Sequence, residues 1–370
     1  MSDLKITKVS VSVVKIPVRA THSHGSGDIT GAVNSVILRL DTDAGITGWG
    51  EASPWSVFTG TLEAAYSTLD VHFRAFLEGA DPFKVNALLA EADRRVVRAT
   101  EAKAAMETAL LDICGKATGR PLHDYLGGRC WDEIPLSFSV ANPNFDEDVE
   151  QVREMVAEGH KIFKMKTGFK DHAFDVMRLE KLRDLFGDSI DLRVDYNQGL
   201  TPYDALPKLR DVESFEPTFI EQPIPMEQRE TMAELARDLD VPLMADETVF
   251  TVRDAVTAVQ MRAADLFSLK IMKSGGAIRA REIAAVAKAA GIGVYGGCMF
   301  ETGIAHAAGT HLMATIPELT LGCEFYMPTY YLADDILTEP FPAGNGVVRV
   351  PTGPGLGVSV DEDKLAKYTV

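Results

Sequence analysis

Six ionisable residues recur through the middle of the chain, and each closes a short apolar run. They are Lys164, Lys166, Asp195, Glu221, Asp246 and Lys270. From Lys166 onward, successive members are 29, 26, 25 and 24 residues apart, about the length of one strand, one helix and two loops. Strands repeating at this interval would place three carboxylates and three lysines at one end of a parallel barrel. The spacing therefore predicts a divalent cation held between candidate amine bases.

The three carboxylates would come from neighbouring strands. Asp195, Glu221 and Asp246 offer only oxygen ligands, without Cys or His, which suits a hard cation. Three carboxylates leave octahedral positions for water and substrate, so Mg²⁺ is favoured over Zn²⁺ or Ca²⁺, with Mn²⁺ as the alternative. Each one alone could be a solvated loop residue or a helix cap, but together at the strand interval they indicate a metal site.

The lysines are candidates for acid-base chemistry. Residues two apart on a strand share a face, so Lys164 and Lys166 would point the same way, as would Asp195 and Asn197. Lysine is rarely buried unless it is paired or functional, which makes Lys166 and Lys270 the candidate acid and base. Lys270 would approach a bound substrate from the opposite side. The competing interpretation is that Lys164 or Lys270 only pairs with a carboxylate of the set.

These residues require a regular array of strands. Eight are expected, at Leu136–Val140, Ile162–Lys166, Asp191–Asp195, Thr218–Glu221, Leu243–Asp246, Leu266–Lys270, Ile292–Gly296 and Leu319–Cys323. The runs are nearly continuous in Val, Ile, Leu and Phe, as in parallel strands that are covered on both faces. A doubly wound sheet would share the alternation of strands and helices, but eight units of similar length favour closure. The predicted fold class is α/β, a modified TIM (β/α) barrel, over residues 131–325.

A different pattern precedes the barrel. Three alternating runs predict an antiparallel meander, at Lys5–Val14, Val33–Leu40 and Ile46–Trp49. Helices are expected at Leu62–Leu77 and Ala102–Lys116. Strands followed by helices form an α+β unit, which we assign to residues 1–130 as an N-terminal capping domain. Residues 326–370, rich in Pro and Gly and with strand-like Gly346–Val350, are expected to return to that domain.

Composition narrows the possible partners. The 370 residues are 46 % hydrophobic and 25 % charged, as in an ordinary globular protein. A formal charge of −17 argues against nucleic acid or an anionic membrane surface as the main partner. Four cysteines without a C-x-x-C pair signal neither a disulfide framework nor a zinc site. Without a signal peptide or a long apolar segment, a cytoplasmic location is expected.

The ordered motifs resemble those of the enolase superfamily, specifically its muconate lactonizing enzyme subgroup. They are Lys164-Met165-Lys166, Asp195-Tyr196-Asn197-Gln198, Glu221-Gln222-Pro223, Ala245-Asp246-Glu247 and Leu269-Lys270-Ile271. The resemblance runs almost end to end. It implies a capping domain over a modified barrel, with Mg²⁺ on the three carboxylates. It further implies Lys166 and Lys270 as acid and base on opposite faces of an enolate, with Lys164 supporting Lys166.

Two later segments narrow the subgroup. The seventh strand leads into Gly296-Gly297-Cys298-Met299 without a histidine, unlike the His-Asp pair of the mandelate racemase pattern. His306 lies further on, in a stretch expected to be a helix. The eighth strand reads Leu321-Gly322-Cys323-Glu324-Phe325, without the Asp-x-Asp motif of dipeptide epimerases. Its Cys-Glu resembles muconate cycloisomerases, so Glu324 is a candidate beside Lys270, and a solvated loop residue is the alternative.

Two loops of the capping domain are expected to close over the substrate. Ala20–Thr30 carries His22 and resembles a mobile lid, although a surface loop with incidental histidines is the alternative. Ser53–Gly60 carries Trp55, which would exclude water or would only pack the interface between the domains.

The favoured function is a Mg²⁺-dependent muconate-type cycloisomerase acting on a small carboxylate, in a homo-oligomer. One alternative keeps the site and changes the outcome to racemisation, epimerisation or dehydration of a cyclic amino acid such as hydroxyproline. Another is a non-catalytic barrel that serves as a binding protein. A Schiff-base aldolase is a weaker option, because such a site seldom needs three clustered carboxylates.

Overall fold

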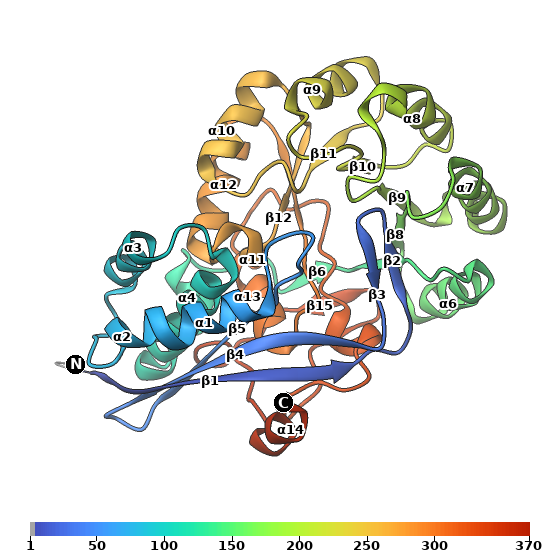
Figure 1. Cartoon of the computed structure of the whole chain (residues 1–370). Coiled ribbons are helices and arrows are strands. Elements are labelled where there is room, and N and C mark those ends of the chain that lie inside the picture. Colours follow the sequence, from blue (N-terminus) through green and yellow to red (C-terminus); the bar gives the residue numbers. More distant parts are fainter. Residues whose placement is uncertain (1–3) are drawn as a thin grey trace.

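The computed structural model describes residues 4–370 and begins with a small antiparallel sheet (Figure 1). Its order is β1 (Ile6–Pro17), β4 (Ala32–Thr42) and β5 (Thr47–Ala52), which confirms the predicted meander. Between β1 and β4 the chain forms a hairpin, β2 (His22–His24) paired with β3 (Gly27–Ile29). Figure 1 shows this hairpin reaching away from the small sheet toward β8 and β9 of the barrel.

Helices cover one side of this sheet. The predicted helix Leu62–Leu77 is present as a continuous run of α1 (Leu62–Ser67), a π-helical turn η1 (Thr68–Phe73) and α2 (Arg74–Leu77). The second predicted helix is α4 (Thr100–Thr118), ended by Gly119 with a φ of +69°. It packs so closely on β5 that a Cβ at Gly50 would lie 1.9 Å from the carbonyl oxygen of Ala105. Two further helices, α3 (Val85–Arg95) and α5 (Leu122–Tyr125), were not predicted.

The larger sheet has seven parallel strands in chain order. They are β7 (Ser137–Val140), β8 (Ile162–Lys166), β9 (Asp191–Asp195), β10 (Ile220–Glu221), β11 (Leu243–Ala245), β12 (Leu266–Leu269) and β13 (Gly293–Gly296). Each strand pairs with the next along the chain, as a barrel requires. The predicted α/β barrel with a small α+β domain is therefore confirmed.

Helices connect these strands around the outside of the sheet (Figure 1). They are α6 (Phe145–Glu158), α7 (His172–Phe186), α8 (Ala205–Glu213), α9 (Arg229–Asp238), α10 (Val252–Met261), α11 (Ile271–Ser274), α12 (Ala277–Ala290) and α13 (Gly303–Ala314). Short 3₁₀ turns precede β9 and α8, at η2 (Gly187–Ser189) and η3 (Pro202–Asp204). No helix within residues 4–370 is long and apolar enough to cross a membrane.

The predicted eighth strand, Leu319–Cys323, is wrong as a strand. Only Cys323 forms parallel bridges, to Leu136 on one side and to Gly296 on the other. Gly322, with a φ of +74°, leaves the extended conformation, so a regular ladder cannot continue through it. The segment still joins the first and last strands of the barrel: the Ser137 amide donates to the Cys323 carbonyl oxygen over 2.7 Å, and the Glu324 amide donates to the Gly296 carbonyl oxygen over 2.9 Å.

The last part of the chain contacts both regions. After a π-helical turn η4 (Met327–Tyr331), β14 (Ala343–Gly344) and β15 (Val347–Arg349) form a sheet with β6 (Glu133–Pro135) at the start of the barrel. Helix α14 (Glu362–Tyr368) then brings Thr369 into an antiparallel bridge with Val14 of β1. The predicted strand near residue 348 therefore pairs beside the barrel, and the final residues contact the N-terminal sheet.

Candidate active site

The six predicted residues gather at the carboxyl ends of the parallel strands. Lys164 and Lys166 lie on β8, and Asp195 and Glu221 are the last residues of β9 and β10. Asp246 and Lys270 follow directly after β11 and β12. The predicted strands included these two residues, whereas the observed strands end one residue earlier. All six side chains are buried, and the most exposed, Lys166, is 6 % exposed. The six residues, which are spread over more than a hundred positions of the sequence, thus form one cluster in space.

Each lysine of the cluster is held by a carboxylate. The Lys166 ammonium donates to Asp195 Oδ2 over 2.6 Å and to Asn197 Oδ1 over 3.1 Å. On the other side of the cluster, Lys270 Nζ lies 2.5 Å from Asp246 Oδ2. The structure therefore contains the ion pair that the competing interpretation predicted, between Lys270 and a carboxylate of the set.

Lys164 lies beneath these two pairs. Its Nζ is 2.7 Å from Glu221 Oε2, 2.6 Å from Glu324 Oε2 and 3.5 Å from Asp195 Oδ2. Glu324 is buried and also accepts from the Cys298 amide, which excludes the solvated-loop alternative for this residue. Lys164 thus connects the carboxylates of β9 and β10 to the segment that closes the barrel.

Burial and charge act in opposite directions on the pKa values of this cluster. Burial by itself would raise the pKa of Asp195, but the ammoniums of Lys166 and Lys164 outweigh it and hold the pKa below its usual value. Burial raises the pKa of Glu221 to about 7, and the neighbouring Asp195 adds to the rise. Burial would lower the pKa of Lys270, yet Asp246 and Glu324 reverse this and raise it. The cluster therefore carries closely packed charges of both signs.

Two members of the cluster were missed by sequence reasoning. Lys273 is fully buried on α11, and its Nζ donates to Asp246 Oδ1 over 2.8 Å and to the Asp246 carbonyl oxygen over 2.6 Å. The feature of the sequence that could have identified Lys273 is its position three residues after Lys270, because residues three apart lie on the same side of a helical turn. Glu247 is 2 % exposed, and burial together with the charge of Asp246 raises its pKa well above the usual value. It directly follows Asp246 in a motif already identified.

The donor atoms of this cluster fit a hard divalent cation. Glu221 Oε1 and both carboxylate oxygens of Glu247 are buried without a hydrogen-bond partner among the described residues. Buried polar atoms are nearly always paired, so unpartnered carboxylate oxygens beside Asp195 and Asp246 are typical of a metal site. All of these donors are oxygen, which suits Mg²⁺ or Mn²⁺.

A small, partly enclosed pocket lies above the cluster. Lys166 and Lys270 both line it, together with Asn197 and Glu324. Its remaining walls are mostly aromatic or sulfur-bearing side chains, from residues His22, His24, Trp55, Phe58, Ser139, Cys298, Met299, Phe300 and Met327. Both predicted loops of the capping domain therefore reach the pocket, through His22 of one and Trp55 of the other.

Buried contacts fix the position of the two loops. His22 Nε2 is 2.9 Å from the Tyr326 hydroxyl, and His22 Nδ1 is 2.8 Å from His24 Nε2. The Trp55 ring packs against the rings of His24 and Phe300, at centroid distances of 4.9 and 5.6 Å. His22 is 4 % exposed, so it is no incidental histidine of a surface loop.

Comparison with known families agrees with this geometry. Residues 7–127 match the mandelate racemase / muconate lactonizing enzyme N-terminal domain, and residues 147–364 match the enolase C-terminal domain-like family. The chain belongs to the mandelate racemase and muconate lactonizing enzyme family of the enolase superfamily. Enzymes of this superfamily use a divalent metal.

Individual relatives lie in the cycloisomerase part of this family. Muconate cycloisomerase 1 of Rhodococcus opacus is 32 % identical to this chain over 380 residues, and the match covers 100 % of both chains. The structure of muconate lactonizing enzyme from Pseudomonas fluorescens complexed with muconolactone superposes with a TM-score of 0.95 at 32 % identity, covering all of both chains. A muconate cycloisomerase from Azorhizobium caulinodans is 46 % identical, with a TM-score of 0.87 over 100 % of this chain and 99 % of that one. The chain is an isomerase of this superfamily, of the cycloisomerase type.

Proposed function

We propose that this cycloisomerase converts a muconate-type dicarboxylate into a lactone. The observation that carries the proposal is that Lys166 and Lys270 line one pocket, each anchored on a different carboxylate, Asp195 and Asp246. Two amines held apart over one cavity can deliver or remove a proton at a carbon between them. The relatives described above, a muconate cycloisomerase and a muconate lactonizing enzyme complexed with muconolactone, agree with this class of reaction.

Asp195, Glu221 and Asp246 would hold the metal, Mg²⁺ in the first place and Mn²⁺ as the alternative. When bound, the ion would neutralise the extra negative charge that the substrate's carboxylate gains as it becomes an enolate. Lys273 and Lys164 contact two of these carboxylates, those of Asp246 and Glu221, from the interior of the protein and not from the pocket. They hold the carboxylates in place without themselves lining the pocket.

The residues of the chain then supply the proton. One substrate carboxylate adds to the distant double bond, so a C–O bond forms and the electron pair moves toward the carbon beside the other carboxylate. An ammonium, of Lys166 or of Lys270, gives its proton to that carbon; a C–H bond forms and the N–H bond breaks. The neutral amine regains a proton from solvent. Asn197 orients Lys166 by accepting one of its hydrogens.

Lys164 supports this step as a fixed cation. Burial alone would lower its pKa, but Glu221 and Glu324 outweigh that effect and raise it well above the usual value, so the side chain stays charged. Because it shares Asp195 with Lys166, it keeps a second positive charge close to the proton donor. Trp55 and the β2–β3 hairpin would exclude water from the pocket.

A second candidate is proton exchange at the α-carbon of a compact cyclic amino acid. It is supported by the pocket lining, where Lys166 and Lys270 are held by two different carboxylates and can act at two sides of one carbon. Racemisation would need both lysines, one to remove the proton and one to return it to the opposite face.

The two candidates are separated by substrate turnover in D₂O. We expect lactone formation from cis,cis-muconate that requires Mg²⁺, is lost in Glu221→Gln, and is lost or reduced at least about a hundredfold in Lys166→Ala and Lys270→Ala. A matched control, Lys103→Ala, removes a buried lysine that pairs with Asp93 away from the pocket. Deuterium exchange on proline-type acids without turnover of muconate would establish the second candidate. Near-normal turnover by Glu221→Gln would exclude this residue as a ligand.

A further inference from the structure

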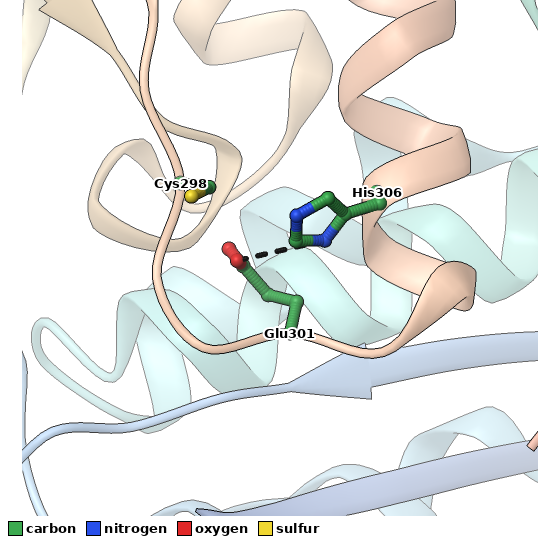
Figure 2. Close-up of side chains that lie close together, drawn as sticks. All are labelled: Cys298, Glu301 and His306. Carbon is green, nitrogen blue, oxygen red and sulfur yellow. Dashed lines mark ion pairs between the residues drawn. The ribbon is translucent and has the colours of Figure 1, made fainter. Parts of the chain in front are cut away.

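A second group of possible ligands lies where the barrel meets α13. Cys298 and Glu301 belong to the loop after β13, and His306 lies in the first turns of α13 (Figure 2). One ligand atom of each residue lies within 4.8 Å of those of the other two. All three side chains are buried. The arrangement is local in sequence, Cys-x₂-Glu-x₄-His, and none of these residues has a role in the proposed proton transfer.

His306 is the unusual member of this group. It is 1 % exposed, and neither ring nitrogen has a hydrogen-bond partner in the part of the chain that the structure describes. Figure 2 shows the ring facing Glu301, with Nδ1 3.7 Å from Oε2, too long for a hydrogen bond. The rings of Phe325 and Phe341 pack edge-on against it, at 5.4 and 5.6 Å. A buried imidazole without partners costs free energy unless something binds it.

The protonation state of His306 suits a ligand. Burial lowers its pKa to about 3, so the ring is neutral at physiological pH and has a free lone pair. The Glu301 carboxylate is fixed by the Met299 amide, which donates to Oε2 over 2.7 Å. Burial raises the pKa of Glu301 to about 8. The Glu301 carboxyl and the His306 imidazole are thus both largely uncharged near neutral pH.

We propose that Cys298, Glu301 and His306 form a second metal site, separate from the carboxylate cluster, for a borderline transition-metal ion such as Zn²⁺ or Co²⁺. Thiolate sulfur and imidazole nitrogen select such ions over Mg²⁺, whereas the oxygen-only cluster beside the lysines has the opposite preference. On binding, the thiol and the carboxyl each release one proton. A divalent ion with one thiolate, one carboxylate and one neutral imidazole carries no net charge, which is the form that a buried site tolerates best.

The pocket offers a route to this site. Cys298 lines the active-site pocket, and its Sγ donates to the carbonyl oxygen of Glu324 over 3.2 Å, so it lies on the border between the two regions. We infer that an ion would enter from the pocket, past the Cys298 side chain. Three protein ligands leave a fourth tetrahedral position for water.

The test is a titration of the Mg²⁺-saturated protein with Co²⁺, followed by absorption. We expect one equivalent to bind with a thiolate-to-cobalt charge-transfer band, which the oxygen-only cluster cannot produce. Cys298→Ser should abolish the band. His306→Gln should weaken Co²⁺ binding at least about tenfold yet keep the band at saturation, because the thiolate remains.

Two other cysteines serve as controls. Cys114→Ser removes a buried thiol that donates to a backbone carbonyl, as Cys298 does, and Cys130→Ser removes an exposed one. Both variants should keep the band. The proposal is overturned if the wild-type protein shows no thiolate band, or if the band survives in Cys298→Ser. Either result stands apart from muconate turnover, so the second site and the proposed function are tested independently.

Discussion

Replacing Lys273 by methionine tests how the buried cluster is held together. The ammonium of Lys273 donates to two oxygens of one residue, the carboxylate Oδ1 and the backbone carbonyl of Asp246. Methionine is of similar length but has no charge and no donor. Among residues 4–370, Asp246 would keep only Lys270 as a partner for its carboxylate. Lys273→Met therefore leaves a partly uncompensated charge and removes one of the two donors to the Asp246 carbonyl, which keeps the Val249 amide at 3.0 Å.

The expected loss follows from these two contacts. A hydrogen bond that involves a charged group contributes about 1.5–3 kcal/mol, and the Lys273 ammonium makes two of them, to the carboxylate and to the carbonyl of Asp246. Together they predict that the free energy of unfolding falls by about 4 kcal/mol without metal, within the range for breaking one partner from a buried ion pair. If Asp246 binds Mg²⁺ as proposed, the ion replaces the lost charge but not the lost donor to the carbonyl. The loss should then shrink to about 2 kcal/mol.

The assay is urea unfolding followed by far-ultraviolet circular dichroism, with the metal removed by a chelator and again with saturating Mg²⁺. Lys103→Met is the matched control, because Lys103 is equally buried but pairs with Asp93, which is half exposed. Its loss should not depend on Mg²⁺. If the loss in Lys273→Met is the same in both conditions to within about 0.5 kcal/mol, Asp246 does not take up the ion.

Two further predictions concern the pH dependence of stability and the binding of substrate. Burial raises the pKa of Glu107 on α4 from 4.5 to about 7, so the folded state keeps a proton that the unfolded state releases. This lowers the free energy of unfolding by about 3 kcal/mol as the pH rises from about 4.5 through 7, and Glu107→Gln should remove that fall whereas exposed Glu63→Gln should not. Trp55→Ala should raise KM about tenfold, because the ring closes the pocket, while Tyr203→Ala, at an aromatic that is 88 % exposed, leaves it unchanged. An unaltered KM in Trp55→Ala would mean that this ring only packs the interface between the domains.

The barrel and its cluster were predictable because they follow one period. Strand, helix and loops repeat at nearly constant length, so residues at the same phase, such as Asp195, Glu221 and Asp246, must meet at one end of the sheet. The eighth strand failed because the signal was an apolar run, whereas the outcome was set by the backbone at Gly322. A single bridging residue, Cys323, is enough to close the barrel, and the hydrophobic periodicity of the sequence does not indicate such a residue.

Residues without a period were harder to predict. Lys273 lies on a one-turn helix, which the sequence presents as an ordinary βα turn. The group of Cys298, Glu301 and His306 gave no sign in the cysteine pattern, because one thiol with a carboxylate and an imidazole matches none of the usual zinc spacings. Its ligands converge only because α13 begins at Gly303 and turns His306 back toward the loop.

The β2–β3 hairpin, which forms a lid over the pocket, contributes shape to the pocket but no positive charge. The carbonyl of Gly27 can only accept, so His24 must donate to it from Nδ1 and accept at Nε2 from His22 Nδ1. His22 Nε2 in turn accepts from the Tyr326 hydroxyl. Burial and the charge of Lys166 lower the pKa of His22 well below its usual value, and burial does the same for His24, so both rings stay neutral.

Every nitrogen of the two lid histidines is therefore already used within the protein. A carboxylate that points toward the hairpin would find no free donor on His22 or His24 and no cation. The lysines that line the pocket, Lys166 and Lys270, both lie on its barrel side. Both carboxylates of a muconate-type substrate would thus be drawn toward the barrel, which favours the folded shape in which one carboxylate reaches the double bond conjugated to the other. A neutral lid over a charged floor would thus promote ring closure, whereas a cationic lid would hold the substrate extended.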